Sequence, residues 1–180
     1  MTVETLENAL RKYAALEQAD ADTAAPFREF LHSDSKVFMR THPAGHFTGS
    51  AWLVSADNER VLLTHHRKLD RWLQLGGHAD GNADLANVAL REAEEESGLI
   101  DLVVEQDIFD LDRHRIPAHD DEPEHWHYDV RYVVRATGSE EFSISEESLA
   151  LAWKSIRDIA GDASADASLR RMASKWLARR

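Results

Sequence analysis

Four of the five residues from 92 to 96 are glutamates, inside a stretch whose spacing predicts a helix over 84–97. The predicted apolar stripe of this helix consists of Leu85, Val88, Ala89 and Ala93. Successive residues of a helix are about 100° apart, so Glu92, Glu95 and Glu96 continue this stripe toward the C-terminal end of the helix. A chain with this pattern must fold so that a partly apolar helix face also accommodates three carboxylates.

The glutamates on this face repel one another. Glu92 is three residues from Glu95 and four from Glu96, and each such pair costs roughly 0.2–0.5 kcal/mol. The helix dipole also disfavours negative charge near the C-terminus. Arg91, four residues before Glu95, offsets part of this charge, and Mg²⁺ or Mn²⁺ would offset more because both ions prefer carboxylate oxygens. A solvated, glutamate-rich surface is the alternative for these residues taken alone.

The composition limits the class of protein. With 180 residues, 43% of them hydrophobic, the chain is large enough for one globular domain with a substantial core. The absence of cysteine excludes disulfides, thiolate catalysis and cysteine-ligated zinc. A net charge of −12 predicts no nucleic-acid partner, although a small phosphorylated ligand is compatible with it. No apolar run is long enough for a membrane span and residues 1–10 lack a secretory signal, so we expect a cytoplasmic protein.

Helices at both ends and a strand-rich middle are predicted. Residues 3–18 have helical spacing, and a second helix is expected from Thr23 and Pro26 onward. Strands are predicted at 46–56, 60–66, 71–77, 102–111, 127–136 and 149–156. One face of strand 127–136 is expected to carry Tyr128, Val130, Tyr132 and Val134, and a last helix carries Leu169, Met172, Trp176 and Leu177. Gly98 is placed to end the glutamate-bearing helix. The order indicates an α+β fold whose mixed sheet is covered on both sides.

Residues 77–99 resemble the signature of the Nudix hydrolases, in which a glycine and a first glutamate precede a helix carrying Arg-Glu-apolar-x-Glu-Glu-x-Gly-apolar. The matching positions are Gly77, Arg91, Glu92, Ala93, Glu95, Glu96, Gly98 and Leu99. Ala83 stands where the family has its first glutamate, and Asp80 and Asp84 are close enough in sequence to take its place. Leu75 also replaces a proline that often precedes the glycine pair.

The resemblance covers roughly residues 45–160 and implies a Nudix-type α/β/α sandwich with a mixed sheet, in a domain expected over residues 36–180. The two N-terminal helices lie outside the resemblance, and residues 1–35 are expected to form a helical extension packed on that core. It implies a metal-dependent hydrolase that cleaves a P–O–P linkage in a nucleoside diphosphate derivative. The implied catalytic residues are Glu92, Glu95, Glu96 and Arg91, which orients the glutamates. The implied ligands of Mg²⁺ or Mn²⁺ are Glu92, Glu95, Glu96 and the carbonyl of Gly76. The candidate general bases are Glu92 first, and then Glu122, Glu124, Glu146 and Glu147.

Two further segments are candidates for substrate binding. The first consists of His65, His66, Arg67 and Lys68. This basic group can hold a phosphate, although a polar turn explains it equally well. The second is the histidine-rich segment 113–127, which is expected to be a long surface loop that covers the substrate, with Trp126 stacking on a base. His125 and His127 would share one face of a strand, as zinc ligands do, but the loop is the favoured interpretation.

Three functions are compatible with these patterns. The favoured function is the metal-dependent hydrolase, which acts on a small molecule. The second is a Nudix-fold nucleotide-binding or regulatory module without turnover, which Ala83 favours and the intact glutamate set disfavours. The third is a zinc-dependent protein built on the histidines. A cysteine-dependent isomerase of the same family is excluded by composition. A homodimer is compatible with the sequence, and no motif names the substrate.

Overall fold

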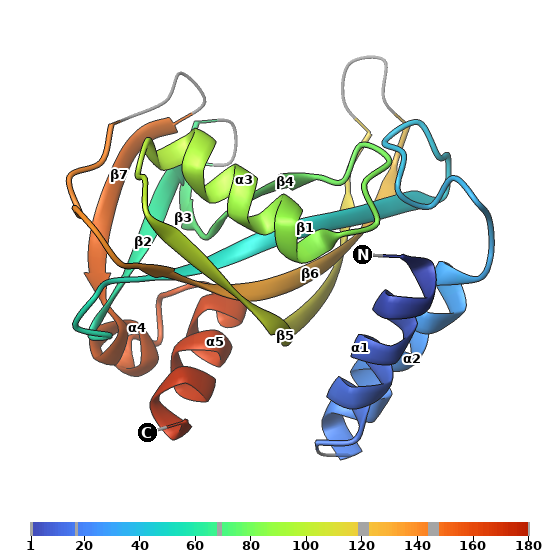
Figure 1. Ribbon diagram of the computed structural model, residues 1–180, viewed down its shortest axis with the longest axis horizontal. Helices are drawn as coiled ribbons and strands as arrows, with labels where there is room; N and C mark the ends of the chain where they lie inside the picture. Colours follow the sequence, from blue (N-terminus) through green and yellow to red (C-terminus); the bar gives the residue numbers. More distant parts are fainter. Residues whose placement is uncertain (1, 17, 68–69, 119–122, 144–147, 180) are drawn as a thin grey trace.

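A mixed sheet with helices on both faces forms the framework of the protein (Figure 1). The computed structural model describes residues 2–16, 18–67, 70–118, 123–143 and 148–179. The helices are α1 (Val3–Ala14), α2 (Gln18–Leu31), α3 (Leu85–Ser97), α4 (Ile156–Gly161) and α5 (Ala167–Ala178). The strands are β1 (Gly45–Val54), β2 (Arg60–His66), β3 (Arg71–Leu73), β4 (Leu75–His78), β5 (Leu102–Ile116), β6 (His125–Ala136) and β7 (Ser148–Ser155). Within the described residues, none of the helices has the length and apolar character that a membrane span requires.

The parallel pairing of β1 with β6 is the centre of the sheet. The strand order is β3-β2-β1-β6-β5, while β4 pairs with residues 48–51 of β1 and β7 pairs with β2. β1 and β6 run in the same direction, with His46 opposite His127, and the other pairings are antiparallel. The predicted strand 71–77 is divided between β3, which pairs with β2, and β4, which pairs with β1. The mixed sheet predicted from the sequence is confirmed.

Alternate residues of β6 face two different cores. The residues that face the core containing α3 are Tyr128, Val130, Tyr132 and Val134, as predicted. On the opposite face of the sheet, α4 and α5 cover a second core that includes Trp52 and Val133. Because a strand directs successive side chains to opposite faces, this alternation places a helical layer on each side. The α/β/α sandwich is thus confirmed, with α3 on one side and α4 and α5 on the other.

The two N-terminal helices pack as a pair beside β5 (Figure 1). Their buried side chains, which belong to the same core as the apolar residues of β1 and β6, include Leu6, Leu10, Phe27 and Phe30. Phe30 stacks on Tyr128 of β6, with 3.9 Å between the ring centroids. This packing supports the predicted extension, and the division of the chain at residue 35 stays a prediction.

α2 begins earlier than the sequence signals indicate. It starts at Gln18, so Pro26 lies inside the helix and not in its first turn. A proline inside a helix removes one hydrogen bond and costs about 3 kcal/mol. The alanine-rich residues before it favour helix, and the burial of Phe27 directly after it offsets the loss. α1 ends at Ala14, which leaves Leu16 outside the helix and 65% exposed.

A buried carboxylate connects α1 to α2. Glu7 accepts hydrogen bonds from Arg28 at 2.7 Å and from Arg11 at 2.6 Å, and His32 lies 3.3 Å away. The hydrogen bond from Arg28, opposed by burial and assisted by Arg11 and His32, lowers the pKa of Glu7 from 4.5 to about 2. A carboxyl group whose pKa is lowered on folding stabilises the folded state above its unfolded pKa. This contribution is lost as the pH falls from about 4.5 toward about 2.

We expect Glu7→Gln to lower the free energy of unfolding by about 1–3 kcal/mol at pH 7, because a hydrogen-bonded charge is removed and Arg28 loses its partner. Urea unfolding at pH 7 and pH 3 measures the effect, and the difference from wild type should be smaller at pH 3. Glu4→Gln is the control, since Glu4 is exposed on the same helix and should change stability by less than about 0.5 kcal/mol. Equal losses for both variants would contradict the role of Glu7.

Candidate active site

The glycine pair of β4 lies directly against the acidic end of α3. The Gly76 N–H donates a hydrogen bond of 2.9 Å to Oε1 of Glu96. A Cβ atom at position 77 would lie 2.5 Å from Oε2 of Glu92, closer than real side-chain atoms approach. Only glycine at position 77 leaves room for this carboxylate. One short strand thus positions two of the three predicted glutamates.

α3 begins and ends where its sequence predicts. Asp84 precedes the first turn and accepts a hydrogen bond from a backbone N–H of that turn. Gly98 adopts a left-handed φ of 68°, and its N–H donates to the Glu94 carbonyl oxygen. Between these ends, Val88 packs against Gly49 of β1. The two caps fix the length of the helix, and the packing on β1 fixes the direction in which its glutamates point.

Arg91 connects the glutamates to β4. Its Nη2 donates to Oε1 of Glu92 at 2.6 Å and to the His78 carbonyl oxygen at 3.2 Å, and its Nε lies 3.9 Å from Oε1 of Glu95. The hydrogen bond to Glu92 raises the pKa of Arg91, although burial opposes it. The Glu92 side chain is 17% exposed and that of Glu95 is 64% exposed. The glutamates therefore differ in environment, with Glu95 on the solvent side.

The donor atoms at this end of α3 suit a hard divalent cation. Glu92 and Glu96 present carboxylate oxygens against the backbone of β4, and Glu95 adds a third carboxylate. Mg²⁺ and Mn²⁺ take oxygen ligands of this kind. The missing Cβ at Gly77 provides the space that the Glu92 carboxylate occupies. These residues fit the cation implied by the sequence, and their assignment as ligands, with the Gly76 carbonyl, stays a prediction.

Ala83, which replaces the first glutamate of the signature, packs against the core. The two acidic residues beside it have other contacts. Asp80 accepts hydrogen bonds of 2.7 and 2.6 Å from Arg40, and Asp84 caps α3. The hydrogen bond from Arg40 lowers the pKa of Asp80, although burial opposes it. Both carboxylates thus have structural contacts, and the replacement of the missing glutamate by Asp80 or Asp84 stays a prediction.

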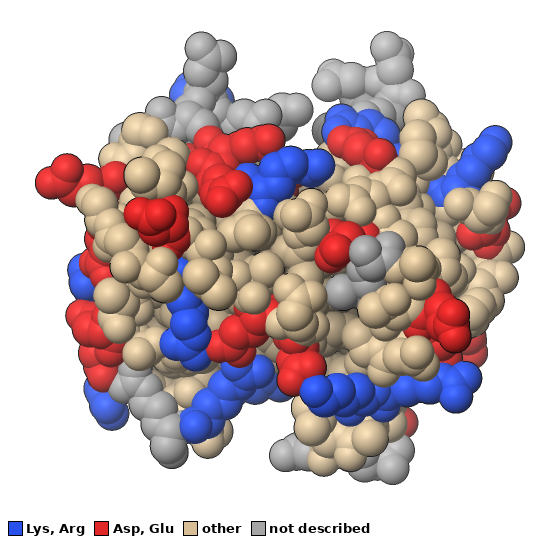
Figure 2. Space-filling model, in the orientation of Figure 1, with Lys and Arg blue, Asp and Glu red and all other residues tan. Residues whose placement is uncertain are grey.

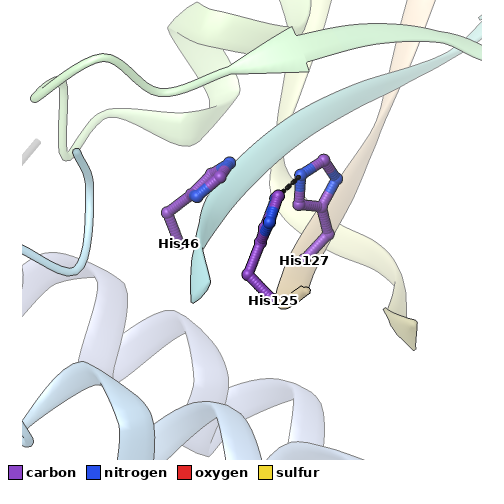
Figure 3. Close-up of side chains that lie close together, drawn as sticks. All are labelled: His46, His125 and His127. Atoms are coloured by element: carbon purple, nitrogen blue, oxygen red, sulfur yellow. Dashed lines mark hydrogen bonds between the residues drawn. The ribbon is translucent and has the colours of Figure 1, made fainter. Parts of the chain in front are cut away.

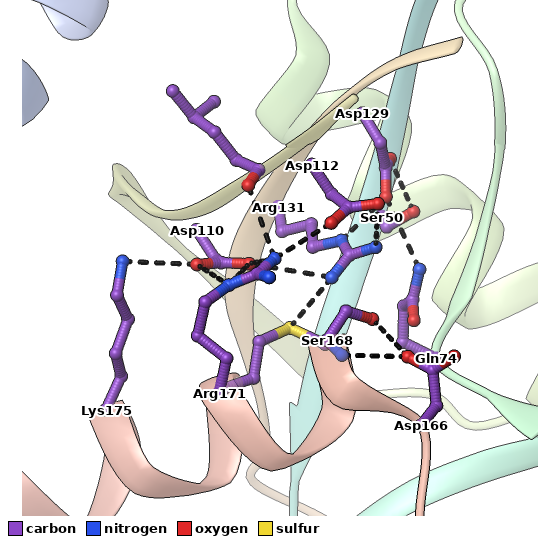
Figure 4. Close-up of polar contacts among 12 residues, drawn as sticks. Ser50, Gln74, Asp110, Asp112, Asp129, Arg131, Asp166, Ser168, Arg171 and Lys175 are labelled. Atoms are coloured by element: carbon purple, nitrogen blue, oxygen red, sulfur yellow. Dashed lines mark hydrogen bonds and ion pairs between the residues drawn. The ribbon is translucent and has the colours of Figure 1, made fainter. Parts of the chain in front are cut away.

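A buried ion network supports the glycine pair from the other face of the sheet (Figure 4). The guanidinium of Arg131 is 3% exposed and contacts the carboxylates of Asp110, Asp112 and Asp129. Burial lowers the pKa of Arg131, but these carboxylates outweigh it and the pKa is raised. Asp129 also accepts a 2.7 Å hydrogen bond from Ser50, whose side chain lies against Gly76. The backbone of the glycine pair therefore rests on a charged, hydrogen-bonded support.

The predicted phosphate-binding group at 65–68 lies at the end of β2. His65 stacks on Trp72, with 5.2 Å between the ring centroids, and its Nε2 lies 3.1 Å from Asp70. His65 and Trp72 line a cleft of about 670 Å³ whose described lining includes none of the α3 glutamates. Arg67 is exposed, and Lys68 is outside the described residues. The structure does not bring His65 to the acidic site, and substrate binding by His65, His66, Arg67 and Lys68 stays a prediction.

Trp126, the predicted stacking residue, carries arginine side chains on its ring. The guanidinium carbons of Arg113 and Arg115 lie 4.3 and 5.5 Å from its ring centroid. The ring is partly buried against the core that α3 also contacts. The Trp126 ring thus already makes cation–π contacts with both arginine side chains. Stacking of a base on Trp126 stays a prediction.

The histidine-rich segment 113–127 is strand at both of its ends, over residues 113–116 and 125–127. β5 and β6 pair as far as Ile116 and His125, so only residues 117–124 connect them. Residues 119–122 lie outside the described part of the chain. The expected surface loop is wrong for residues 113–116 and 125–127, because backbone pairing does not require apolar side chains and the histidines of the two strands pack against one another. For residues 117–124 it stays a prediction.

No sequence pattern indicates a role for His46. It lies at the start of β1, opposite His127 in the parallel pair. Its ring centroid is 5.1 Å from that of His125 and 4.9 Å from that of His78. The only signal is the alternation of side chains between the two faces of β1 and of β6. It places His46 beside His127 only when the pairing of these strands is known.

Comparison with known proteins identifies the family. The family model described as the NUDIX domain matches residues 46–176. A NUDIX-family hydrolase from Clostridium perfringens is 28% identical, with a TM-score of 0.55, over 75% of this chain and 98% of that one. A C. elegans Ap4A hydrolase binary complex is 16% identical, with a TM-score of 0.57, over 74% and 96%. The NUDIX domain of Shewanella oneidensis NrtR complexed with ADP ribose is 19% identical, with a TM-score of 0.52, over 84% and 96%. No curated protein matches the chain.

The α/β/α sandwich and the acidic helix packed on a glycine pair define a class of hydrolases that cleave phosphate anhydrides. The family model covers well over half of the chain, so the chain belongs to the Nudix family. It is accordingly a pyrophosphohydrolase of the Nudix type. The resemblance that rests on residues 77–99 is confirmed.

We expect Gly77→Ala to fold but to weaken Mn²⁺ binding by about tenfold or more, because the new Cβ displaces the flexible Glu92 carboxylate. Calorimetric titration with Mn²⁺ and a thermal unfolding curve measure the two properties. Gly161→Ala is the matched control, since a Cβ at that position at the end of α4 meets no atom within 4 Å. Wild-type Mn²⁺ affinity in Gly77→Ala would show that the position of Glu92 is not important for binding.

Proposed function

We propose that this protein hydrolyses a P–O–P linkage in a nucleoside diphosphate derivative, with Mg²⁺ or Mn²⁺ bound by Glu92, Glu95, Glu96 and the carbonyl of Gly76. The observation that carries this proposal is the packing of the Glu92 and Glu96 carboxylates on the glycine pair of β4. Like charges held together against a protein backbone are unfavourable unless positive charge shares the site. Arg91 supplies one positive charge, and a divalent cation supplies the remainder.

Two structural neighbours support a nucleotide-derived substrate. One is an Ap4A hydrolase and the other is a NUDIX domain complexed with ADP ribose, which is itself a nucleoside diphosphate derivative. An anionic ligand requires local positive charge on a chain whose net charge is −12. On the face seen in Figure 2, acidic side chains are widespread and basic ones form only short groups. A bound divalent cation therefore explains how such a substrate approaches the acidic helix.

The residues of α3 account for the proton transfer. Water attacks one phosphorus, the bond from that phosphorus to the bridging oxygen breaks, and both products leave as phosphates. When bound, the divalent cation screens the phosphate charges and lowers the pKa of water. Glu92 takes the proton of the attacking water.

The other glutamates considered as the general base have different positions. Glu124 forms an ion pair with Arg115 at the connection between β5 and β6. Glu122, Glu146 and Glu147 are outside the described residues. Glu92 therefore stays the first candidate for the general base, and Glu122, Glu146 and Glu147 stay the alternatives. A cytoplasmic location, a homodimer and a small-molecule partner remain part of the proposal on the grounds given by the sequence.

We expect Glu96→Gln and Glu95→Gln each to lower kcat by about a hundredfold or more, with a smaller change in KM, because the lost charge matters most as negative charge develops on phosphorus. The melting temperature should be unchanged or raised, since repulsion on α3 is relieved. Glutamine at position 96 retains an oxygen that can accept from the Gly76 N–H. Glu94→Gln is the matched control, because Glu94 is exposed on the same helix.

The substrate class is tested with nucleotide sugars, dinucleoside polyphosphates, ADP-ribose and nucleoside triphosphates, each with Mg²⁺ and with Mn²⁺. Turnover of one class by wild type and by Glu94→Gln, with loss in Glu95→Gln and Glu96→Gln, is the expected result. Tight binding of one class without turnover would instead identify a nucleotide-binding module. Equal turnover by all four proteins would remove the glutamates from the mechanism.

A further inference from the structure

Three histidines meet on the sheet face opposite α3. His46 of β1 is opposite His127 of β6, and His125 lies two residues earlier on the same face of β6. The candidate ligand nitrogens of the three rings all lie within 4.8 Å of one another. Figure 3 shows the rings directed toward a common point between the two strands. We refer to His46, His125 and His127 as the histidine cluster.

His46 is the least satisfied member of the histidine cluster. Its side chain belongs to a residue that is 1% exposed, and neither ring nitrogen has a hydrogen-bond partner among the described residues. A buried polar group without a partner costs about 1–3 kcal/mol, and nearly all such groups in folded proteins are satisfied. A ligand that accepts a nitrogen lone pair would remove this cost.

The contacts of His125 prepare a nitrogen for a metal. Its Nδ1 lies 2.8 Å from the Pro123 carbonyl oxygen, which can only accept, so Nδ1 carries the proton and the lone pair of the neutral ring is on Nε2. Ligating histidines in metal sites are oriented by the same kind of bond. Nε2 of His125 lies 3.3 Å from Nε2 of His127. Two nitrogens bound to a tetrahedral zinc ion are about 3.3 Å apart, because each Zn–N bond is about 2.0–2.1 Å.

A direct hydrogen bond between His125 and His127 would also produce this separation. That explanation leaves both nitrogens of His46 unsatisfied. An ion between the three rings accounts for the short separation and satisfies one nitrogen of His46. The His46 nitrogen needs to close by roughly 1.5 Å at most to complete the tetrahedral geometry. Such a shift is within the reach of a side-chain rotation.

The histidine cluster offers imidazole nitrogens as its candidate ligand atoms. Imidazole nitrogens suit zinc and neighbouring transition metals, whereas Mg²⁺ prefers oxygen.

We propose that the histidine cluster binds a Zn²⁺-class transition-metal ion, at a site separate from the α3 carboxylates. Three protein ligands leave one position of a tetrahedral ion open, which is the arrangement of zinc sites that bind water or a ligand oxygen. His114 adjoins His127, with 5.4 Å between the ring centroids, and its Nδ1 lies 3.1 Å from Asp112. The site thus borders the ion network beneath it. It does not depend on hydrolysis at α3, so it stands or fails independently of the proposed function.

The test uses the full chain, freed of metal by a chelator and titrated calorimetrically with Zn²⁺ in excess Mg²⁺, which occupies the carboxylates. We expect one tight Zn²⁺ site in wild type. His125→Ala and His127→Ala should each weaken it by more than about a hundredfold, because even residues that only orient a ligand contribute ten- to a hundredfold. His32→Gln is the matched control, since His32 is exposed at the contact between α1 and α2 and should bind Zn²⁺ as wild type does.

Substitution of Co²⁺ for Zn²⁺ keeps the test decisive if a histidine variant fails to fold. Wild type should show the intense visible absorption of four-coordinate cobalt, and His125→Ala should lose it. Zn²⁺ binding that is unchanged in both His125→Ala and His127→Ala would overturn the proposal. So would Zn²⁺ binding that disappears in Glu96→Gln but persists in the histidine variants, or a cobalt spectrum typical of six oxygen ligands.

Discussion

The burial of Arg131 is the constraint on which the rest of the structure depends. A buried guanidinium requires carboxylate partners, because an uncompensated buried charge costs about 3–5 kcal/mol. Its carboxylate partners are Asp110 and Asp112 of β5 and Asp129 of β6. Arg171 and Lys175 of α5 balance the excess negative charge of these carboxylates. These charges can be satisfied together only in one relative position of β5, β6 and α5. The network thereby fixes the register of the strands that also carry the histidine cluster.

The same network extends to the acidic helix through a short series of contacts. Asp129 accepts a hydrogen bond from Ser50, Ser50 lies against Gly76, and the Gly76 N–H donates to Glu96. Each contact involves a glycine or a small polar side chain, so there is little freedom for the strands to shift. The geometry of the α3 carboxylates therefore depends on a charge buried on the opposite face of the sheet. Asp129 thus connects the buried ion network to the acidic end of α3.

β4 contributes to both faces of the sheet. Gly77 leaves room for Glu92 on the α3 side, whereas the next side chain, that of His78, lies beside His46 on the other side. Strand alternation thus separates oxygen donors from nitrogen donors by the thickness of one sheet. Hard cations suit the first set and zinc-class ions the second, because carboxylate and imidazole differ in the metals they prefer. The two proposed metal sites, the α3 carboxylates and the histidine cluster, lie on opposite faces of the sheet and are chemically compatible within one small domain.

The sequence alone determined α3, from Asp84 to Gly98, and the direction of Glu92 and Glu96, because helical period and helix ends depend on residues within a few positions of one another. Glu95, expected on the same face, lies on the solvent side in the structure. The alternation of β6 was equally local. Only the tertiary structure decided that α2 includes Pro26, that Arg40 engages Asp80, and that His46 meets the histidines of β6. These outcomes depend on strand register and packing between segments far apart in the chain. A one-residue shift of a strand would direct every side chain to the other face. Alternation within one strand does not reveal which residue of a distant strand lies opposite.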